Sequence, residues 1–121
     1  MVYSYDSEYA SLLYKKCKDE DNNEYIKIIS GNVNGDFLNI PSTIDEIPVV
    51  EIENAAFLQG TFKYITLPQN LKFIRHSAFC NCSYLEEITF PDSLLCVEEN
   101  AFKSCMRLKE VNFNNGLQEI G

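Results

Sequence analysis

A phrase that recurs every 23 residues is the feature that most constrains how this chain folds. Short apolar segments begin at Ile65, Ile88 and Val111, so both intervals between them are 23 residues. Other pairs at the same interval are Leu71 and Leu94, Ala78 and Ala101, Phe79 and Phe102, Cys82 and Cys105, and Leu85 and Leu108. Self-similarity at a fixed interval of this length predicts a repeat architecture, in which each unit stacks on the one before it.

Each unit begins with a short strand. In the unit that starts at Ile88, the apolar residues Ile88 and Phe90 alternate with a polar one, which predicts a strand with two side chains turned inward. Pro91 ends this strand, because proline cannot donate the next hydrogen bond of a sheet. Leu94 and Val97 then point inward again from a second, shorter extended segment. Two extended segments per unit are therefore expected.

The segment 101–105, Ala-Phe-x-x-Cys, is predicted to close the unit as a short helical or 3₁₀ turn with apolar side chains beneath the coil. One coil cannot bury its own apolar residues, but stacked coils line them up in columns, with neighbouring strands about 4.8 Å apart. The predicted columns are Ile65, Ile88 and Val111; Leu67, Phe90 and Phe113; Ile52, Ile74, Val97 and Ile120; and Phe57, Phe79 and Phe102. The expected fold class is a β-rich, α/β-type repeat solenoid with coils that start near residues 38, 65, 88 and 111.

Residues 1–37 do not carry the repeat. Segments 11–17 and 24–30 read as two strands across a polar turn, and we expect this hairpin to cover the first coil and hide its open end. The predicted organisation is a capping hairpin region over 1–37 and a solenoid over 38–121. The sequence stops at Gly121, before the next Ala-Phe is due, so we expect either a longer repeat array or an uncapped C-terminal edge that allows self-association.

The repeat phrase resembles the BspA-type leucine-rich repeat, the family of Treponema-pallidum-like leucine-rich repeats, whose pattern is IxLPxxLxxIxxxAFxxCxxL. Segments 70–74 (Asn-Leu-x-x-Ile), 77–82 (Ser-Ala-Phe-Cys-Asn-Cys) and 101–105 carry the match, which covers about residues 38–121. Gly60 departs from it by standing near the place of Cys in a shortened turn. The resemblance implies a right-handed coil with parallel strands on a concave face, no enzymatic activity, and a role in adhesion or recognition at cell surfaces.

The charge and the apolar runs exclude several classes of partner. A net charge of −8 with no clustered basic face argues against nucleic acid and against an anionic membrane surface. No apolar run approaches the roughly 18–20 residues that span a bilayer, so membrane insertion is not expected. No signal peptide is readable. Localisation stays open: the resemblance suggests the cell surface or secretion, whereas free cysteines would suit a reducing compartment.

Five cysteines raise the alternatives of a metal site, a disulfide or free thiols. No Cys-x₂-Cys pair occurs, which disfavours zinc, and the repeat explains Cys82 and Cys105 as small buried apolar groups. Free thiols are the favoured interpretation. Cys80 and Cys96, which stand outside the repeat column, are the candidates for reactive thiols.

Two further motifs have plain interpretations. His76, the single histidine, lies in a predicted bend without a nucleophile or an orienting group, so we expect a surface residue. The segment 19–24 begins like a calcium loop, but Glu24 stands where such loops need glycine, and Ser30 stands where they need glutamate. A solvated hairpin turn is favoured. The sequence therefore predicts no catalytic residues, no metal site and no cofactor.

The remaining signal is a polar face. Residues that flank the inward Ile or Val of each strand should project from the concave side, and they are rich in hydroxyl, amide and carboxylate groups. This face is either a recognition surface for a basic or polar protein partner or merely the solvated side of a sheet. The favoured function is non-enzymatic protein binding through the concave face, and the alternative is a spacer or self-associating segment of a longer array. The candidate binding residues are Tyr64, Thr66, Glu87, Thr89, Glu110 and Asn112.

Overall fold

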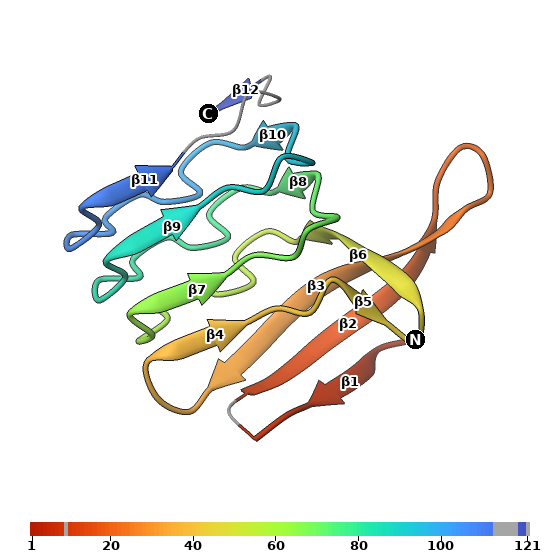
Figure 1. Cartoon of the computed structure of the whole chain (residues 1–121), viewed down its shortest axis with the longest axis horizontal. Helices are drawn as coiled ribbons and strands as arrows, with labels where there is room; N and C mark the ends of the chain where they lie inside the picture. The colour runs from red at the N-terminus through yellow and green to blue at the C-terminus, as the bar shows by residue number, and fades with distance from the viewer. Residues whose placement is uncertain (9, 113–118, 121) are drawn as a thin grey trace.

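The structure is a computed structural model that describes residues 1–8, 10–112 and 119–120. Its strands form two sheets, and Figure 1 shows the coils stacked with β4, β7, β9 and β11 along one side and β6, β8, β10 and β12 along the other. The first half of the strands is β1 (Tyr3–Asp6), β2 (Ala10–Lys18), β3 (Glu24–Val33), β4 (Phe37–Asn39), β5 (Thr43–Ile44) and β6 (Ile47–Ile52). The second half is β7 (Tyr64–Thr66), β8 (Phe73–Ile74), β9 (Glu87–Thr89), β10 (Cys96–Val97), β11 (Glu110–Asn112) and β12 (Glu119–Ile120).

The strand registers confirm the stacking of like residue on like residue. Ile74 pairs with Ile52 on one neighbouring strand and with Val97 on the other, and Val97 also pairs with Ile120. Ile52, Ile74 and Val97 are buried. In the four-stranded sheet the order is β11-β9-β7-β4, and all three pairings are parallel. Ile88 pairs with Val111 there, as predicted; Phe113, predicted for another column, lies outside the described residues.

The aromatic column is also confirmed. The ring of Phe79 stacks on Phe57 at 5.4 Å and on Phe102 at 5.2 Å between centroids. A fourth ring, which the repeat phrase did not reveal, belongs to Phe62; it is buried and meets both Phe57 and Phe79 edge-on. A Cβ atom at Gly60 would lie 2.4 Å from Cε1 of Phe62. Gly60 therefore makes room for a ring where the later coils carry the smaller Leu85 or Leu108.

The expected short helical or 3₁₀ piece is instead a run of turns, and no helix occurs among the described residues. Ser77 and Asn81 have φ angles of 58° and 61°, and such left-handed residues interrupt a right-handed helix. The amide of Ala78 donates to its own coil, at Arg75 O, whereas the amide of Phe79 donates to Ala101 O in the next coil. Successive amides therefore bond alternately within one coil and to the next coil, which joins the coils through their backbones. The corresponding residues with positive φ in the neighbouring coils are Ala55, Gln59, Asn100 and Ser104.

The N-terminal hairpin is confirmed as β2 and β3, which pair antiparallel, and β1 adds a further strand that the sequence did not predict. β3 then pairs in parallel with β6, so the hairpin continues the larger sheet. Leu12, Tyr14, Ile26 and Ile28 join the same buried cluster as the coils. The boundary between 1–37 and 38–121 stays a prediction. The described residues contain no helix that is long and apolar enough to cross a bilayer.

Candidate functional site

Strand register, and a hollow that Thr66 and Thr89 both line, bring all six predicted face residues into two adjacent rows. In one row Glu87 lies across from Tyr64 and from Glu110, and in the other Thr89 lies across from Asn112. β4 extends both rows, because Phe37 pairs with Tyr64 and Asn39 pairs with Thr66. We call these eight residues the ladder face: Phe37, Asn39, Tyr64, Thr66, Glu87, Thr89, Glu110 and Asn112.

The ladder face is polar over most of its length and aromatic at one end. Thr66, Glu87 and Thr89 are exposed and Tyr64 is half-buried, whereas the inward residue Ile88 is buried between Glu87 and Thr89. The side chains of Glu110 and Asn112 lie outside the described part of the chain. The eight positions carry two carboxylates and no basic residue, which makes the face acidic.

Phe37 is, with Asn39, a part of the ladder face that sequence reasoning missed. Its side chain is 60% exposed, and its ring stacks on Tyr64 at 5.1 Å between centroids. The available signal is the coil expected to start near residue 38, because alternation about the inward Leu38 puts its two neighbours, Phe37 and Asn39, on the same face. A large exposed aromatic that is held by a second ring is typical of an interaction site.

The loop before Phe37 is fixed to the next coil. The carbonyl of Asp36 accepts hydrogen bonds from the amides of Lys63 and Tyr64, at 2.8 and 2.9 Å. Gly35 has a φ of 102°, which favours glycine at this turn. A hollow of about 420 Å³ lies here, lined by Asn34, Gly35, Asp36, Phe37 and Asn39. The aromatic end of the ladder face is therefore concave and anchored by backbone hydrogen bonds.

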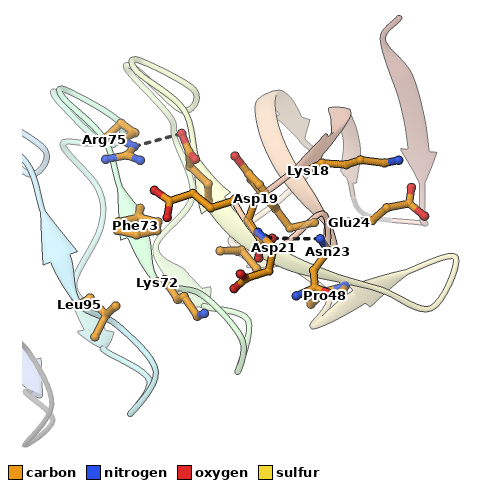
Figure 2. Close-up of a pocket in the computed structure, with 14 residues that line it drawn as sticks. Lys18, Asp19, Asp21, Asn23, Glu24, Pro48, Lys72, Phe73, Arg75 and Leu95 are labelled. Atoms are coloured by element: carbon orange, nitrogen blue, oxygen red, sulfur yellow. Dashed lines mark hydrogen bonds and ion pairs between the residues drawn. The ribbon is translucent and has the colours of Figure 1, made fainter.

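A second concave region lies between the β2–β3 turn and the outer side of β6, β8 and β10, and Figure 2 shows its residues. We call it the hairpin cleft. Its volume is about 680 Å³, and residues 18–21 and 23–25 face it from the hairpin. From the coils the lining residues are Pro48, Val50, Glu51, Lys72, Phe73, Arg75 and Leu95. Sequence analysis did not predict this cleft.

The acidic turn at the edge of this cleft has the structure of a hairpin turn, as predicted. Oδ1 of Asp19 accepts hydrogen bonds from the amides of Asp21 and Asn23, both at 2.9 Å, and Asn22 has a φ of 66°. This carboxylate therefore serves to hold the backbone of the turn. No group of three or more potential metal ligands gathers within the described residues.

The five cysteines are free thiols in the structure. The thiol of Cys82 is buried and donates to Phe57 O at 3.1 Å, and that of Cys105 donates to Phe79 O at 3.2 Å. Burial raises the pKa of Cys82 to about 12 and also raises the pKa of Cys105. These thiols act as core groups, as the repeat predicted. Cys80 and Cys96 are half-buried, and their reactivity stays a prediction. His76 is exposed, as expected.

A family model described as the BspA type leucine-rich repeat region, in six copies, matches residues 50–121. The chain belongs to the BspA-type leucine-rich repeat family. This confirms the family that the repeat phrase indicated. A comparison with curated proteins found no match.

Solved structures place the BspA-type chain in the leucine-rich repeat fold. It is 27% identical to the T. pallidum leucine-rich repeat protein, with a TM-score of 0.79, and the match covers 95% of this chain and 52% of that one. A leucine-rich repeat protein from Bacteroides capillosus is 21% identical, with a TM-score of 0.79 and coverage of 98% and 87%. A leucine-rich cell surface protein from Faecalibacterium prausnitzii is 16% identical, with a TM-score of 0.56 and coverage of 88% and 40%.

The matches give the extent of the BspA-type chain relative to a solved protein and the kind of module it forms. The chain spans about half the length of the T. pallidum protein. Family and fold together identify a strand-rich repeat module with parallel strands, of a kind that generally serves as a non-enzymatic scaffold.

Proposed function

We propose that the chain is a non-enzymatic binding module that recognises a protein partner through the ladder face. The observation that carries the proposal is the exposed ring of Phe37, stacked on Tyr64 at the head of one row of the ladder face and beside a second, polar row. Aromatic anchors with a polar surround are the usual source of affinity at protein interfaces.

The charge of the ladder face favours a basic or polar partner surface. Glu87 and Glu110 occupy the same row as the aromatic pair, and no lysine or arginine stands among the eight positions. Charge complementarity chiefly selects partners and speeds their association. The name of the F. prausnitzii structure, a leucine-rich cell surface protein, supports the cell surface as the setting.

Site-specific photo-crosslinking tests the proposal. A benzophenone amino acid at Thr66, in the middle of the ladder face, should capture a partner from the native surroundings of the protein. The same group at Lys103, an exposed residue in the turns, serves as the control and should capture nothing in common. Phe37→Ala and Glu87→Lys should each abolish capture at Thr66 while leaving the melting temperature unchanged. Equal capture from both positions, or capture that survives both substitutions, would show that the ladder face is not the site.

Self-association remains a second candidate function. Among the described strands, β11 ends the order of the four-stranded sheet, and Val111 on it is 36% exposed. Exposed strand edges are templates for pairing with another chain. The uncapped C-terminal edge that was predicted to mediate this contact involves residues 113–118 and 121, which lie outside the described residues. A mass that rises with protein concentration in sedimentation would favour this function over recognition of a different protein.

A further inference from the structure

We propose that the hairpin cleft is a second binding site, and that it takes a protein segment in which an apolar side chain stands next to a lysine or arginine. The cleft lies on the larger sheet, whereas the ladder face belongs to the four-stranded sheet, so the two sites are separate. Its volume of about 680 Å³ falls within the range of about 300–1,000 Å³ that is common for ligand sites.

The first argument is a set of apolar side chains that the core does not use. Tyr25, Val50, Phe73 and Leu95 are half-buried, and all four line the cleft. None of them belongs to the buried core cluster or to the partly buried residues packed against it. The buried core therefore does not account for their apolar character. Apolar side chains gathered in a concavity and edged by charge are typical of a binding site.

A β-bulge helps to build this apolar floor. In the pairing of β3 with β6, Ile26 faces Val49 but Lys27 faces Glu51, so Val50 is skipped in the register. Val50 and Glu51 are consecutive, yet both line the cleft. A bulge bends its strand and re-aims a side chain, which accounts for this arrangement.

The second argument concerns Arg75, whose charge is already engaged. Its Nε lies 3.0 Å from a carboxylate oxygen of Glu51, and its Nη1 lies 3.1 Å from one of Glu98. The guanidinium carbon also lies 4.5 Å from the centroid of the Phe73 ring, which fixes that ring in the floor. Arg75 is thus a structural part of the cleft wall, and an anionic ligand would have to compete with two carboxylates for it.

The third argument is the sign of the remaining charge. The turn places the exposed carboxylates of Glu20, Asp21 and Glu24 at the edge of the cleft, and none of the three forms an ion pair with a described residue. Lys18 and Lys72 also line the cleft but are fewer than the acidic groups, which include Asp19. Figure 2 shows Asp19, Asp21 and Asn23 on one side, with Lys72, Phe73, Arg75 and Leu95 on the other. An apolar floor beside a net acidic edge complements an apolar residue that adjoins a basic one.

Methyl and amide NMR titration tests this proposal on the intact chain. The probes are two blocked Gly-Ser peptides that differ only in a central Leu-Arg or Leu-Glu pair. The Leu-Arg peptide should shift the methyl signals of Val50 and Leu95 saturably, and the Leu-Glu peptide should bind on the order of tenfold more weakly, as expected for the loss of one favourable charge contact. The amide signal of Thr66 reports on the ladder face and should stay in place, which separates the two sites.

Charge variants locate the peptide. The double variant Asp21→Lys/Glu24→Lys should remove the preference for the Leu-Arg peptide, and Leu95→Ser should weaken binding of both peptides. Glu8→Lys makes an exposed charge reversal in the turn at the other end of β2 and should change neither affinity. The buried Ile74 methyl signal checks that each variant is folded.

Three results would overturn the inference. One is that neither peptide moves Val50 and Leu95; another is that the Leu-Glu peptide binds as tightly as the Leu-Arg peptide or more tightly, which would point to an anion site at Lys72. The third is that the two methyl signals shift with protein concentration alone, which would identify a second copy of the chain as the occupant.

Discussion

The rings of Phe57 and Phe79 lie face to face, with 5.4 Å between centroids and 8° between planes. Phe79 stacks in the same way on Phe102 and meets Phe62 edge-on, so it contacts three rings and is fully buried. Phe79→Ala should therefore lower the free energy of unfolding by about 3–5 kcal/mol, because it removes buried area and leaves a cavity. Phe102→Ala is the matched comparison and should cost less, since Phe102 is only half-buried. Urea denaturation measures both, and an unchanged midpoint for Phe79→Ala would refute the stacked core.

Gly60 and Phe62 form a compensating pair. A Cβ atom added at Gly60 would lie 2.4 Å from the Phe62 ring. That ring cannot move aside, because it is buried against Phe57 and Phe79. Gly60→Cys, which places the cysteine of the repeat at this position, should thus lower the free energy of unfolding by about 1–3 kcal/mol through overpacking. Adding Phe62→Leu should recover part of this loss, because it restores the smaller residue of the other coils. Additive effects of the two changes in a double-mutant cycle would contradict this coupling.

The ion pairs of Arg75 connect three coils, from Glu51 to Glu98. Partial burial by itself lowers the pKa of Arg75, but hydrogen bonds and charge from Glu51 and Glu98 outweigh it, so its pKa is raised. Glu51 is only 8% exposed, and Arg75→Met would leave its carboxylate without this partner. We expect Arg75→Met to lower the free energy of unfolding by about 1–3 kcal/mol, because a buried carboxylate without its partner is costly.

Lys16→Met is the control for this network. Lys16 lies 3.9 Å from Asp45, whose side chain is 67% exposed, and such surface pairs contribute about 0–1 kcal/mol. Equal losses for the two variants, measured by chemical denaturation, would mean that the Arg75 pairs contribute no more than a surface pair does.

The columns of the solenoid were predictable because each one repeats an apolar residue at a step of 22 or 23 residues. Ile74 between Ile52 and Val97 follows from counting, since a parallel stack brings equivalent positions together. The six predicted face residues follow from the repeat and from alternation within each strand. The two neighbours of a buried residue such as Ile88 point to the opposite side of the sheet. What was missing at Phe37 was only the extension of this rule to the first coil.

Features that depend on contacts between unlike segments could not be predicted from the repeat interval. The parallel pairing of β3 with β6 joins Ile26 to Val49, outside the repeat, so neither the bulge at Val50 nor the hairpin cleft has a periodic signal. β1 is a short strand at the end of the larger sheet, in which Tyr3 and Tyr5 alternate with Ser4 and Asp6; it lies outside the repeat, so no interval predicts its pairing with β2. The segment 101–105 forms turns and not the expected helical piece, because spacing alone does not reveal the positive φ of Asn100 and Ser104.

Cys82 should make stability depend on pH in alkaline solution. Burial raises the pKa of its thiol from an ordinary 9.0 to about 12, so between these values the folded chain keeps a proton that the unfolded chain has lost. Stability therefore falls as pH rises above about 9, because unfolding then releases a proton. Cys82→Ala should flatten this part of the stability curve, although it lowers stability at neutral pH.

In the folded protein at pH 8, iodoacetamide should modify Cys80 well before Cys82, as followed by mass spectrometry of the peptides. Equal rates at the two thiols would mean that Cys82 is not sealed in the core.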